Sequence, residues 1–214
     1  LQDVRDFFTQ YYAPNNATLA IVGDVDVEKT KALVEKYFGT IPKGPDVTPV
    51  DVQTPAIPEE RRKVVTDQVE LPRVYISWIT APFFKPGDAD ADIAGHILGG
   101  GKASRLYKSL VYEKKSAQDA SASQQSAGLS STFLIRATAK PGHTADELQA
   151  AIEHELDSLA TSGPTPDELV AAKNAIHTAI ITSLENVGSF GGVADRLQTY
   201  NHYTGDAGYL KDRK

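Results

Sequence analysis

Two residue types are missing from the sequence. None of its 214 residues is Cys, which excludes disulfide bonds, Cys-ligated zinc and thiol catalysis. None is Met either, so we expect the chain to be a mature product or, as the better interpretation, a piece excised from a longer protein. No apolar run approaches the roughly 20 residues needed to span a bilayer, and the opening residues do not have the pattern of a signal peptide.

Basic residues are in the minority. The chain has 22 Lys and Arg against 28 Asp and Glu, a formal net charge of −6. Basic clusters occur only at Arg61-Arg62-Lys63 and at Lys114-Lys115, and we interpret both as solvated surface. A nucleic-acid-binding domain normally presents a basic face, so we expect no nucleic-acid partner.

Hydrophobic periodicity predicts that strands and helices alternate along the chain. The predicted helices cover residues 1–12, 27–38, about 88–98, 103–114, 144–159, 165–185 and 193–201, and the predicted strands cover 17–22, 64–80, 117–125 and 130–139. Asp26 is the predicted N-cap of the second helix, and Thr144 and Thr165 each open a capping-box sequence. The pattern predicts an α+β fold in which helices cover mainly one face of a sheet.

Residues 42–60 predict an extended connector. They contain five prolines and no hydrophobic periodicity, and proline stiffens such a segment. A domain boundary could lie here, but the stretch before it is too short to hold its own core. We therefore predict one domain over residues 1–214, with a helix–strand–helix at 1–41, the connector at 42–60, and the main sheet and helices at 61–214.

Five short motifs follow one another in an order that indicates a family. They are Tyr11-Tyr12-Ala13-Pro14-Asn15-Asn16-Ala17-Thr18, Ile21-Val22-Gly23-Asp24-Val25, Tyr37-Phe38-Gly39 with Ile41-Pro42, Ile97-Leu98-Gly99-Gly100-Gly101, and Ala103-Ser104-Arg105-Leu106-Tyr107. Each is weak alone, but together they resemble the C-terminal-type, non-catalytic domain of the M16 zinc metallopeptidases, the family of insulinase, pitrilysin and mitochondrial processing peptidase. The resemblance covers nearly the whole chain. It implies a two-layer α/β sandwich with a mainly antiparallel sheet, and zinc in the parent protein.

The zinc motif of that family is absent. M16 enzymes carry His-x-x-Glu-His on a helix, because residues at i and i+4 share one helix face. The five histidines are His96, His143, His154, His177 and His202, and no pair has this spacing. His154-Glu155 begins like His-Glu-x-x-His, but Ser158 takes the fifth position. We therefore predict no catalytic residue, no metal ligand and no cofactor in this chain, which alone should be inactive.

The resemblance implies a second feature that is also missing. In the second half of M16 enzymes, an Arg and a Tyr after the Ser-Arg-Leu motif help to hold substrate at the zinc. Counting from Ser104 places Val111 and Gln118 at those positions. The substrate-binding residues therefore remain unknown, and we expect the chain to come from the zinc-bearing half, directly after the zinc domain, although degenerate partner halves also exist.

Other candidate chemistry has simpler structural interpretations. Gly99 to Ser104 lacks the spacing of a phosphate-binding loop and does not follow a strand. The serines between 121 and 131 lack the Gly-x-Ser-x-Gly elbow and predict a solvated strand face. The aspartates at 88, 90 and 92 lie at a predicted helix start, where the helix dipole favours them, and the EF-hand pattern for calcium is missing.

The sequence thus predicts a non-catalytic domain of an M16 zinc metalloendopeptidase that cleaves peptides or unfolded proteins. The resemblance implies that two halves form a clamshell chamber, whose wall this domain helps to build against other M16 domains of the same chain or of a partner subunit. The alternative is an interaction or scaffold module of a homologue that has lost peptidase activity. The family's bacterial members and the absence of Cys favour the bacterial periplasm, with the mitochondrial matrix second.

Two structural expectations follow from single stretches of sequence. Val74, Ile76 and Trp78 share one strand face, so we predict that Trp78 is buried beneath the helices. The opening helix carries Phe7, Phe8, Tyr11 and Tyr12, more aromatic residues than one helix stripe can bury. We predict that some of these four rings are exposed where a partner domain belongs.

Overall fold

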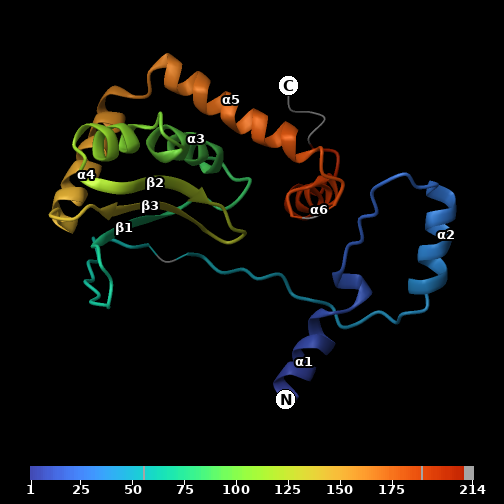
Figure 1. Ribbon diagram of the computed structural model, residues 1–214. Helices are drawn as coiled ribbons and strands as arrows, with labels where there is room; N and C mark the ends of the chain where they lie inside the picture. The colour runs from blue at the N-terminus through green and yellow to red at the C-terminus, as the bar shows by residue number, and fades with distance from the viewer. Residues whose placement is uncertain (55, 189, 210–214) are drawn as a thin grey trace. The chain divides into compact units, whose positions relative to one another are not determined.

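A computed structural model describes residues 1–54, 56–188 and 190–209, and these residues form two units (Figure 1). The larger unit comprises Gln53–Thr178, and the smaller unit comprises Leu1–Val52 and the chain from Ala179 onward. Pro55, one of the prolines of the predicted connector, lies outside the described residues. The prediction of a single domain stays a prediction.

A three-stranded antiparallel sheet is the centre of the larger unit. Its strands are β1 (Arg73–Thr80), β2 (Ala117–Gln125) and β3 (Ser131–Ala139), in the order β1-β3-β2. β2 and β3 are the two arms of the predicted hairpin. Ile135 of β3 lies opposite Ile76 on one side and Ala122 on the other. Because side chains alternate between the faces of a strand, these three residues form one apolar row on the same face.

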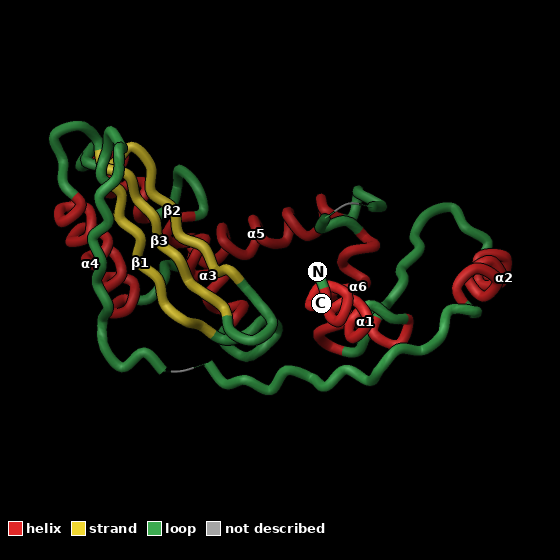
Figure 2. Tube along the Cα trace, turned by 90° about the horizontal axis from the view of Figure 1, so that it is seen from below, coloured by secondary structure: helices red, strands yellow, loops and turns green. Residues whose placement is uncertain are grey.

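Helices cover that apolar face (Figures 1 and 2). They are α3 (Asp88–Gly99), the π-helix η2 (Tyr107–Glu113) and α4 (Ala145–Ser162). The next helix along the chain is α5 (Pro166–Ser183). Leu98, Leu106, Leu110, Leu148 and Ile152 join the core, and each is at most 2% exposed. The opposite face has polar side chains and no helix of this unit. The structure is therefore the predicted α+β two-layer sandwich with helices on one face of the sheet.

Both predicted capping boxes form. At α4, Thr144 Oγ1 accepts a hydrogen bond from the Glu147 amide, and the Glu147 carboxylate accepts one from the Thr144 amide. Thr165 and Glu168 make the same reciprocal pair at α5. Each box satisfies two amides that a helix start otherwise leaves without partners.

The close contact between α3 and β2 explains the glycine motif. A Cβ atom at position 99 would overlap the backbone nitrogen of Ala122 and lie 2.8 Å from its Cα atom. One turn earlier, a Cβ atom at position 95 would lie 3.3 Å from Ser123 Cα. The helix therefore rests on the strand backbone, and the closest approach occurs at Gly99.

The smaller unit contains α1 (Gln2–Tyr11), the 3-10 helix η1 (Pro14–Asn16), α2 (Val27–Phe38) and α6 (Val193–Thr204). Asp26 caps α2 as predicted, because its side chain accepts a hydrogen bond from the Lys29 amide. Neither α1 nor α2 has a buried residue. Phe7, Phe8, Tyr11 and Tyr12 are 42–69% exposed, which confirms the predicted exposure of these rings; that a partner domain covers them stays a prediction.

One predicted strand is wrong, because residues 17–22 form no strand. Of the β-rich stretch 64–80, only Arg73–Thr80 is a strand. A strand requires a neighbouring backbone for its hydrogen bonds, and the described residues offer none to residues 17–22 or 64–72. The helix predicted at about 103–114 is present, and most of it is the π-helix η2.

The predicted burial of Trp78 is wrong, although its side chain lies on the predicted face of the strand. It lies on the helix-facing side of β1 and contacts Phe133, with ring centroids 6.1 Å apart. The side chain is nevertheless 42% exposed, because β1 is an edge strand and nothing in the described residues covers its outer side.

We expect Gly99→Ala to lower the free energy of unfolding by about 1–3 kcal/mol, because the added methyl group overpacks a rigid backbone contact. Urea denaturation measures the change. Gly188→Ala is the control, since a Cβ atom there meets nothing within 4 Å, and it should not destabilise the protein. Equal stability of Gly99→Ala and the unsubstituted protein would contradict the close packing of α3 on β2.

Candidate functional site

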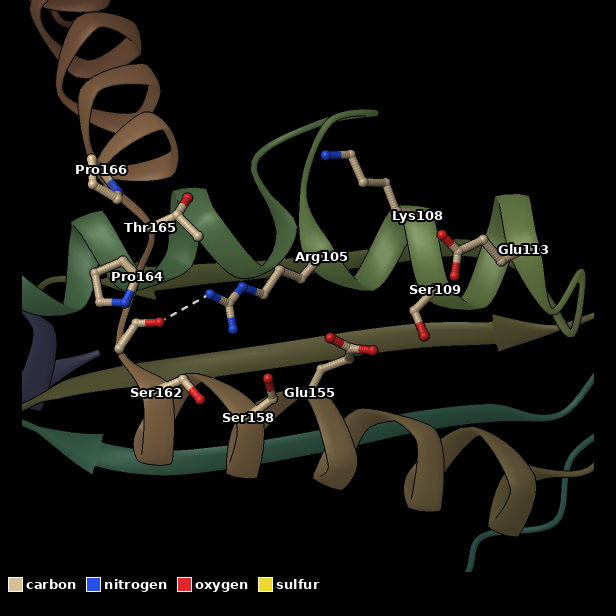
Figure 3. A pocket seen from close by; sticks show the side chains of 11 residues that line it. Arg105, Lys108, Ser109, Glu113, Glu155, Ser158, Ser162, Pro164, Thr165 and Pro166 are labelled. Atoms are coloured by element: carbon tan, nitrogen blue, oxygen red, sulfur yellow. Dashed lines mark hydrogen bonds between the residues drawn. The ribbon is translucent and has the colours of Figure 1, made fainter.

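A groove in the larger unit lies between η2, α4 and the start of α5 (Figure 3). Its volume is about 650 Å³. Charged and hydroxyl side chains face it: Arg105, Lys108, Ser109, Glu113, Glu155, Ser158, Ser162 and Thr165. The groove is wide and open to solvent, so any chemistry in it depends on how these side chains are paired.

Arg105 is paired with its neighbours through two of its three nitrogen atoms. Its Nε and Nη2 atoms donate to the two carboxylate oxygens of Glu168, each at 2.7 Å. Nη2 also donates to the carbonyl oxygen of Gly163 at 3.1 Å (Figure 3). This bidentate geometry is the strong form of an Arg–carboxylate pair. Arg105 therefore ties the start of η2 to the α4–α5 turn.

Glu168 stays ionised far into the acid range. The hydrogen bonds from Arg105 lower its pKa from 4.5 to about 2, partial burial opposes them, and the Thr165 amide adds to the lowering. The Arg105 pKa is raised, chiefly by the same hydrogen bond. The two side chains are 14% and 27% exposed, so the ion pair is shielded from water and more stabilising than a typical surface pair.

The other residues of the Ser-Arg-Leu motif also support the fold. Ser104 Oγ donates to the Gly101 carbonyl oxygen at 2.6 Å, which closes the turn after α3. Leu106 is fully buried in the core. Arg105 pairs with Glu168. The motif therefore positions α3, η2 and α5.

A second polar cluster surrounds Asp88 at the start of α3. The carboxylate accepts hydrogen bonds from Gln124 Nε2 at 3.0 Å, from Ser126 Oγ at 2.6 Å and from the Phe84 amide at 3.1 Å. Gln124 in turn accepts one from Thr80 Oγ1 at 3.0 Å. Asp88 is buried, and every polar atom of this cluster has a partner. It anchors the loop after β1 to the β2–β3 hairpin.

Burial raises the pKa of the neighbouring Asp92, and the charge of Asp88 adds to this effect. A raised carboxylate pKa can mark an acid–base residue. His96, one turn further along α3, opposes this rise, and no hydrogen bond or ion pair of the Asp92 carboxylate is found among the described residues. The arrangement gives no catalytic constellation.

The histidines do not come together in the described part of the chain. His96 is partly buried, His143 pairs with Glu147 at 3.0 Å, and His154, His177 and His202 lie on exposed helix surfaces. Among the residues that the structure describes, no three His, Asp or Glu side chains are placed to hold a metal ion. The residues present therefore do not fit a zinc site.

The residues at the two positions where the family's Arg and Tyr would stand, Val111 and Gln118, do not form a substrate-holding pair. Val111 packs against the hydrophobic core, and Gln118 is an exposed residue at the bulge of β2. Sequence analysis did not foresee the Arg105–Glu168 pair or the Asp88 cluster. Their members are 63 and 36–38 residues apart in sequence, and no local pattern connects them.

The fold is an α+β domain, and both polar clusters described above connect its elements. Comparison with known proteins gives the family. The model described as "Peptidase M16 inactive domain" matches residues 1–176, and the chain belongs to the M16 peptidase family.

Individual relatives agree with this assignment. The chain is 30% identical to the zinc protease PqqE of Helicobacter pylori over 204 residues, which are 92% of this chain and 45% of that protein. A crystal structure of a protease from Helicobacter pylori matches 99% of this chain and 51% of its own, with 29% identity and a TM-score of 0.84. The first half of the periplasmic protease PqqL from Escherichia coli shares the fold, with a TM-score of 0.72, 18% identity, and coverage of 94% of this chain and 44% of that one.

The chain therefore spans about half the length of the relatives it matches. In the described residues, no helix combines the length and the apolar character needed to cross a bilayer.

Replacing Glu168 should change how stability depends on pH. The ordinary pKa of 4.5 falls to about 2 on folding, so this carboxylate stabilises the protein fully above pH 4.5 and loses its effect as the pH falls toward 2. We expect Glu168→Gln to lower the free energy of unfolding at pH 7 by about 2–3 kcal/mol and to flatten its decline between pH 5 and 2.

Asp167→Asn is the matched control, since Asp167 is an exposed carboxylate in the same helical turn. It should cost less than about 1 kcal/mol. Denaturant titrations at several pH values give the comparison, and parallel curves for both variants would contradict the role of the Arg105–Glu168 pair.

Proposed function

We propose that this chain is the non-catalytic domain of an M16 zinc metalloendopeptidase that cleaves peptides or unfolded proteins, and that it forms part of the wall of the peptidase chamber. The observation that carries the proposal is membership of the M16 family combined with a described structure that has no zinc-ligand set. Relatives twice as long are named as zinc proteases. In this proposal the zinc and its ligands belong to the part of the protein outside this chain.

The open face of the sheet is the surface that we assign to the chamber wall. Tyr75, Arg136 and Ser121 form one cross-strand row on it, and Ser77, Leu134 and Ser123 form the next. Most of these side chains are accessible, and the face mixes hydroxyl, aromatic and cationic groups. Such a surface can contact many unfolded chains weakly without selecting one sequence.

The smaller unit supplies the surface that we assign to docking against another M16 domain. Phe7 stacks with Tyr11, with ring centroids 4.9 Å apart, and Phe8 with Tyr12 at 4.5 Å. All four rings are at least 42% exposed. Exposed aromatic clusters of this kind normally mark a protein interface, and a second M16 domain, in the same chain or in a partner subunit, is the partner we propose.

The periplasm is the compartment we propose for the protein. The support is the shared fold with the periplasmic protease PqqL and the absence of Cys from the sequence.

Activity should require the rest of the protein. We expect the purified chain of residues 1–214 to show no sub-micromolar zinc binding and no cleavage of denatured casein, because no spaced ligand set is available. The full-length protein should contain His-x-x-Glu-His, cleave casein, and lose this activity when a chelator removes zinc. Tight stoichiometric zinc uptake by the chain alone in calorimetric titration would contradict the proposal. A full-length protein without the motif or the activity would favour the scaffold alternative.

The aromatic surface should be buried in the full-length protein. We expect Phe8→Ser with Tyr12→Ser to lower its thermal midpoint by several degrees, since each buried aromatic side chain removes about 150–250 Å² from water. Tyr112→Ser is the control, because Tyr112 is 75% exposed on η2 in the other unit. If both variants melt like the unsubstituted protein, the four rings do not face another domain.

A further inference from the structure

The strands of the sheet carry few charged residues, and those residues share one face. They are Arg73 of β1, Asp119 of β2 and Arg136 of β3. Side chains alternate between the two faces of a strand, and Ile135 belongs to the core on the helix-facing side. Arg136 therefore lies on the open face. The register puts Arg73 and Asp119 on the same face, because they flank Thr138 from either side.

Arg73 is held in place across this face. Its Nε atom donates to Thr138 Oγ1 at 2.8 Å, and its Nη1 atom donates to the Tyr75 hydroxyl oxygen at 3.4 Å. Thr138 is only 5% exposed although it lies on the open face, as expected where the stem of an arginine lies over it. Both acceptors are neutral. The two hydrogen bonds therefore orient the guanidinium group without neutralising its charge.

Arg136 lies beside this arrangement, on the central strand. It is directly opposite Tyr75 and diagonal to Arg73, and long side chains at diagonal positions of a sheet can reach one another. The Arg136 side chain is exposed, and its guanidinium group has no hydrogen bond or ion pair among the described residues. Tyr75, which is 60% exposed, thus has an arginine on each of two sides.

The positive charges of this cluster are not balanced within the sheet. Asp119 is the one acidic residue of the three strands, and among the described residues it forms no ion pair with either arginine. Two guanidinium groups are therefore like-charged neighbours in a chain whose net charge is −6. Like charges repel one another, and an anion bound between them would remove this repulsion.

The three side chains offer the donors that a carboxylate accepts. Both guanidinium groups keep N–H groups without a partner among the described residues. The Tyr75 hydroxyl accepts from Arg73 and still has its own proton to donate. A carboxylate is only an acceptor, and an arginine can give it two parallel N–H bonds. The cluster is therefore complementary to a carboxylate group.

We propose that Arg73, Tyr75 and Arg136 form a subsite for a carboxylate group of a bound peptide. The open face would then prefer peptides that have acidic side chains or a free C-terminus, a selection by charge and not by sequence. The inference rests on the proposed function in taking a peptide as the bearer of the carboxylate. A polyanion such as a nucleic acid is disfavoured by the net charge of −6, whereas a local pair of arginines can hold an isolated carboxylate.

Binding of three unstructured peptides to the full-length protein tests the subsite. A chelator is present so that no peptide is cleaved, and fluorescence anisotropy gives each Kd. The first peptide has glutamates and an amidated C-terminus, the second has glutamines and a free C-terminus, and the third has glutamines and an amidated C-terminus. We expect the first or the second to bind more tightly than the third, which identifies the source of the carboxylate. The proposal fails if neither does, or if a short oligonucleotide binds more tightly than both in an Arg136-dependent way.

Substitution of Arg136 separates the subsite from general charge. We expect Arg136→Gln to weaken binding of the preferred peptide by about three- to tenfold, the range for partly exposed charged hydrogen bonds, and to leave the third peptide unaffected. Lys102→Gln is the matched control, because it removes the same charge from the exposed turn after α3, a helix on the other side of the sheet (Figure 1). No effect of Arg136→Gln, or an equal effect of both substitutions, would overturn the proposal.

A double-mutant cycle shows whether the two arginines hold the same group. Arg73→Gln should weaken the same peptide, and the double variant should lose less than the product of the two single losses, because both donors serve one carboxylate. Multiplicative losses would contradict a shared subsite. Thermal midpoints check that the variants are folded, and Arg136→Gln should not change the midpoint, since this exposed side chain has no protein partner among the described residues.

These measurements do not use peptidase activity. A full-length protein that cleaves nothing, but binds acid-bearing peptides through Arg136, would remove the proposed function and leave this inference standing. A full-length protein that cleaves casein, but whose peptide Kd values do not respond to Arg136→Gln, would remove this inference alone.

Discussion

The contact between α3 and the backbone of β2 is the constraint on which the larger unit depends. A helix can approach a strand this closely only where it has no side chain, and Gly99 provides that position against Ala122. The approach brings Leu98 into the core beside Ile135. It also sets where the chain leaves the helix, so that Ser104 can close the following turn and Leu106 can enter the core. The glycine motif, one of the five that indicate the family, is thus required for the packing of α3 on β2.

Two polar clusters then fix the connections between the layers. Asp88 joins the loop after β1 to the β2–β3 hairpin, and Arg105 joins η2 to the start of α5 through Glu168. Both clusters are shielded from water and have their hydrogen bonds satisfied, the condition under which buried polar groups stabilise a fold. The charges of both clusters therefore serve to hold the fold together.

The two edges of the sheet differ. The β2 edge has a bulge and lies against α3, whereas the pairing of β1 with β3 runs without interruption. In the smaller unit, α1 and α2 bury no residue, so the core of the described structure lies in the larger unit.

Local patterns in the sequence determined most of the elements: the two capping boxes, the Asp26 cap, the hairpin and the helices recur close to their predicted positions, because each depends on neighbouring residues. The five ordered motifs also sufficed for the family. Residues 17–22 and 64–72 have strand-like sequences but no strand partner, and pairing is a long-range property that composition does not specify. The exposure of Trp78 likewise depended on tertiary structure, because the order of the strands places β1 at the edge of the sheet. The Arg105–Glu168 pair depended on it too, because the fold brings together two residues that are distant in sequence.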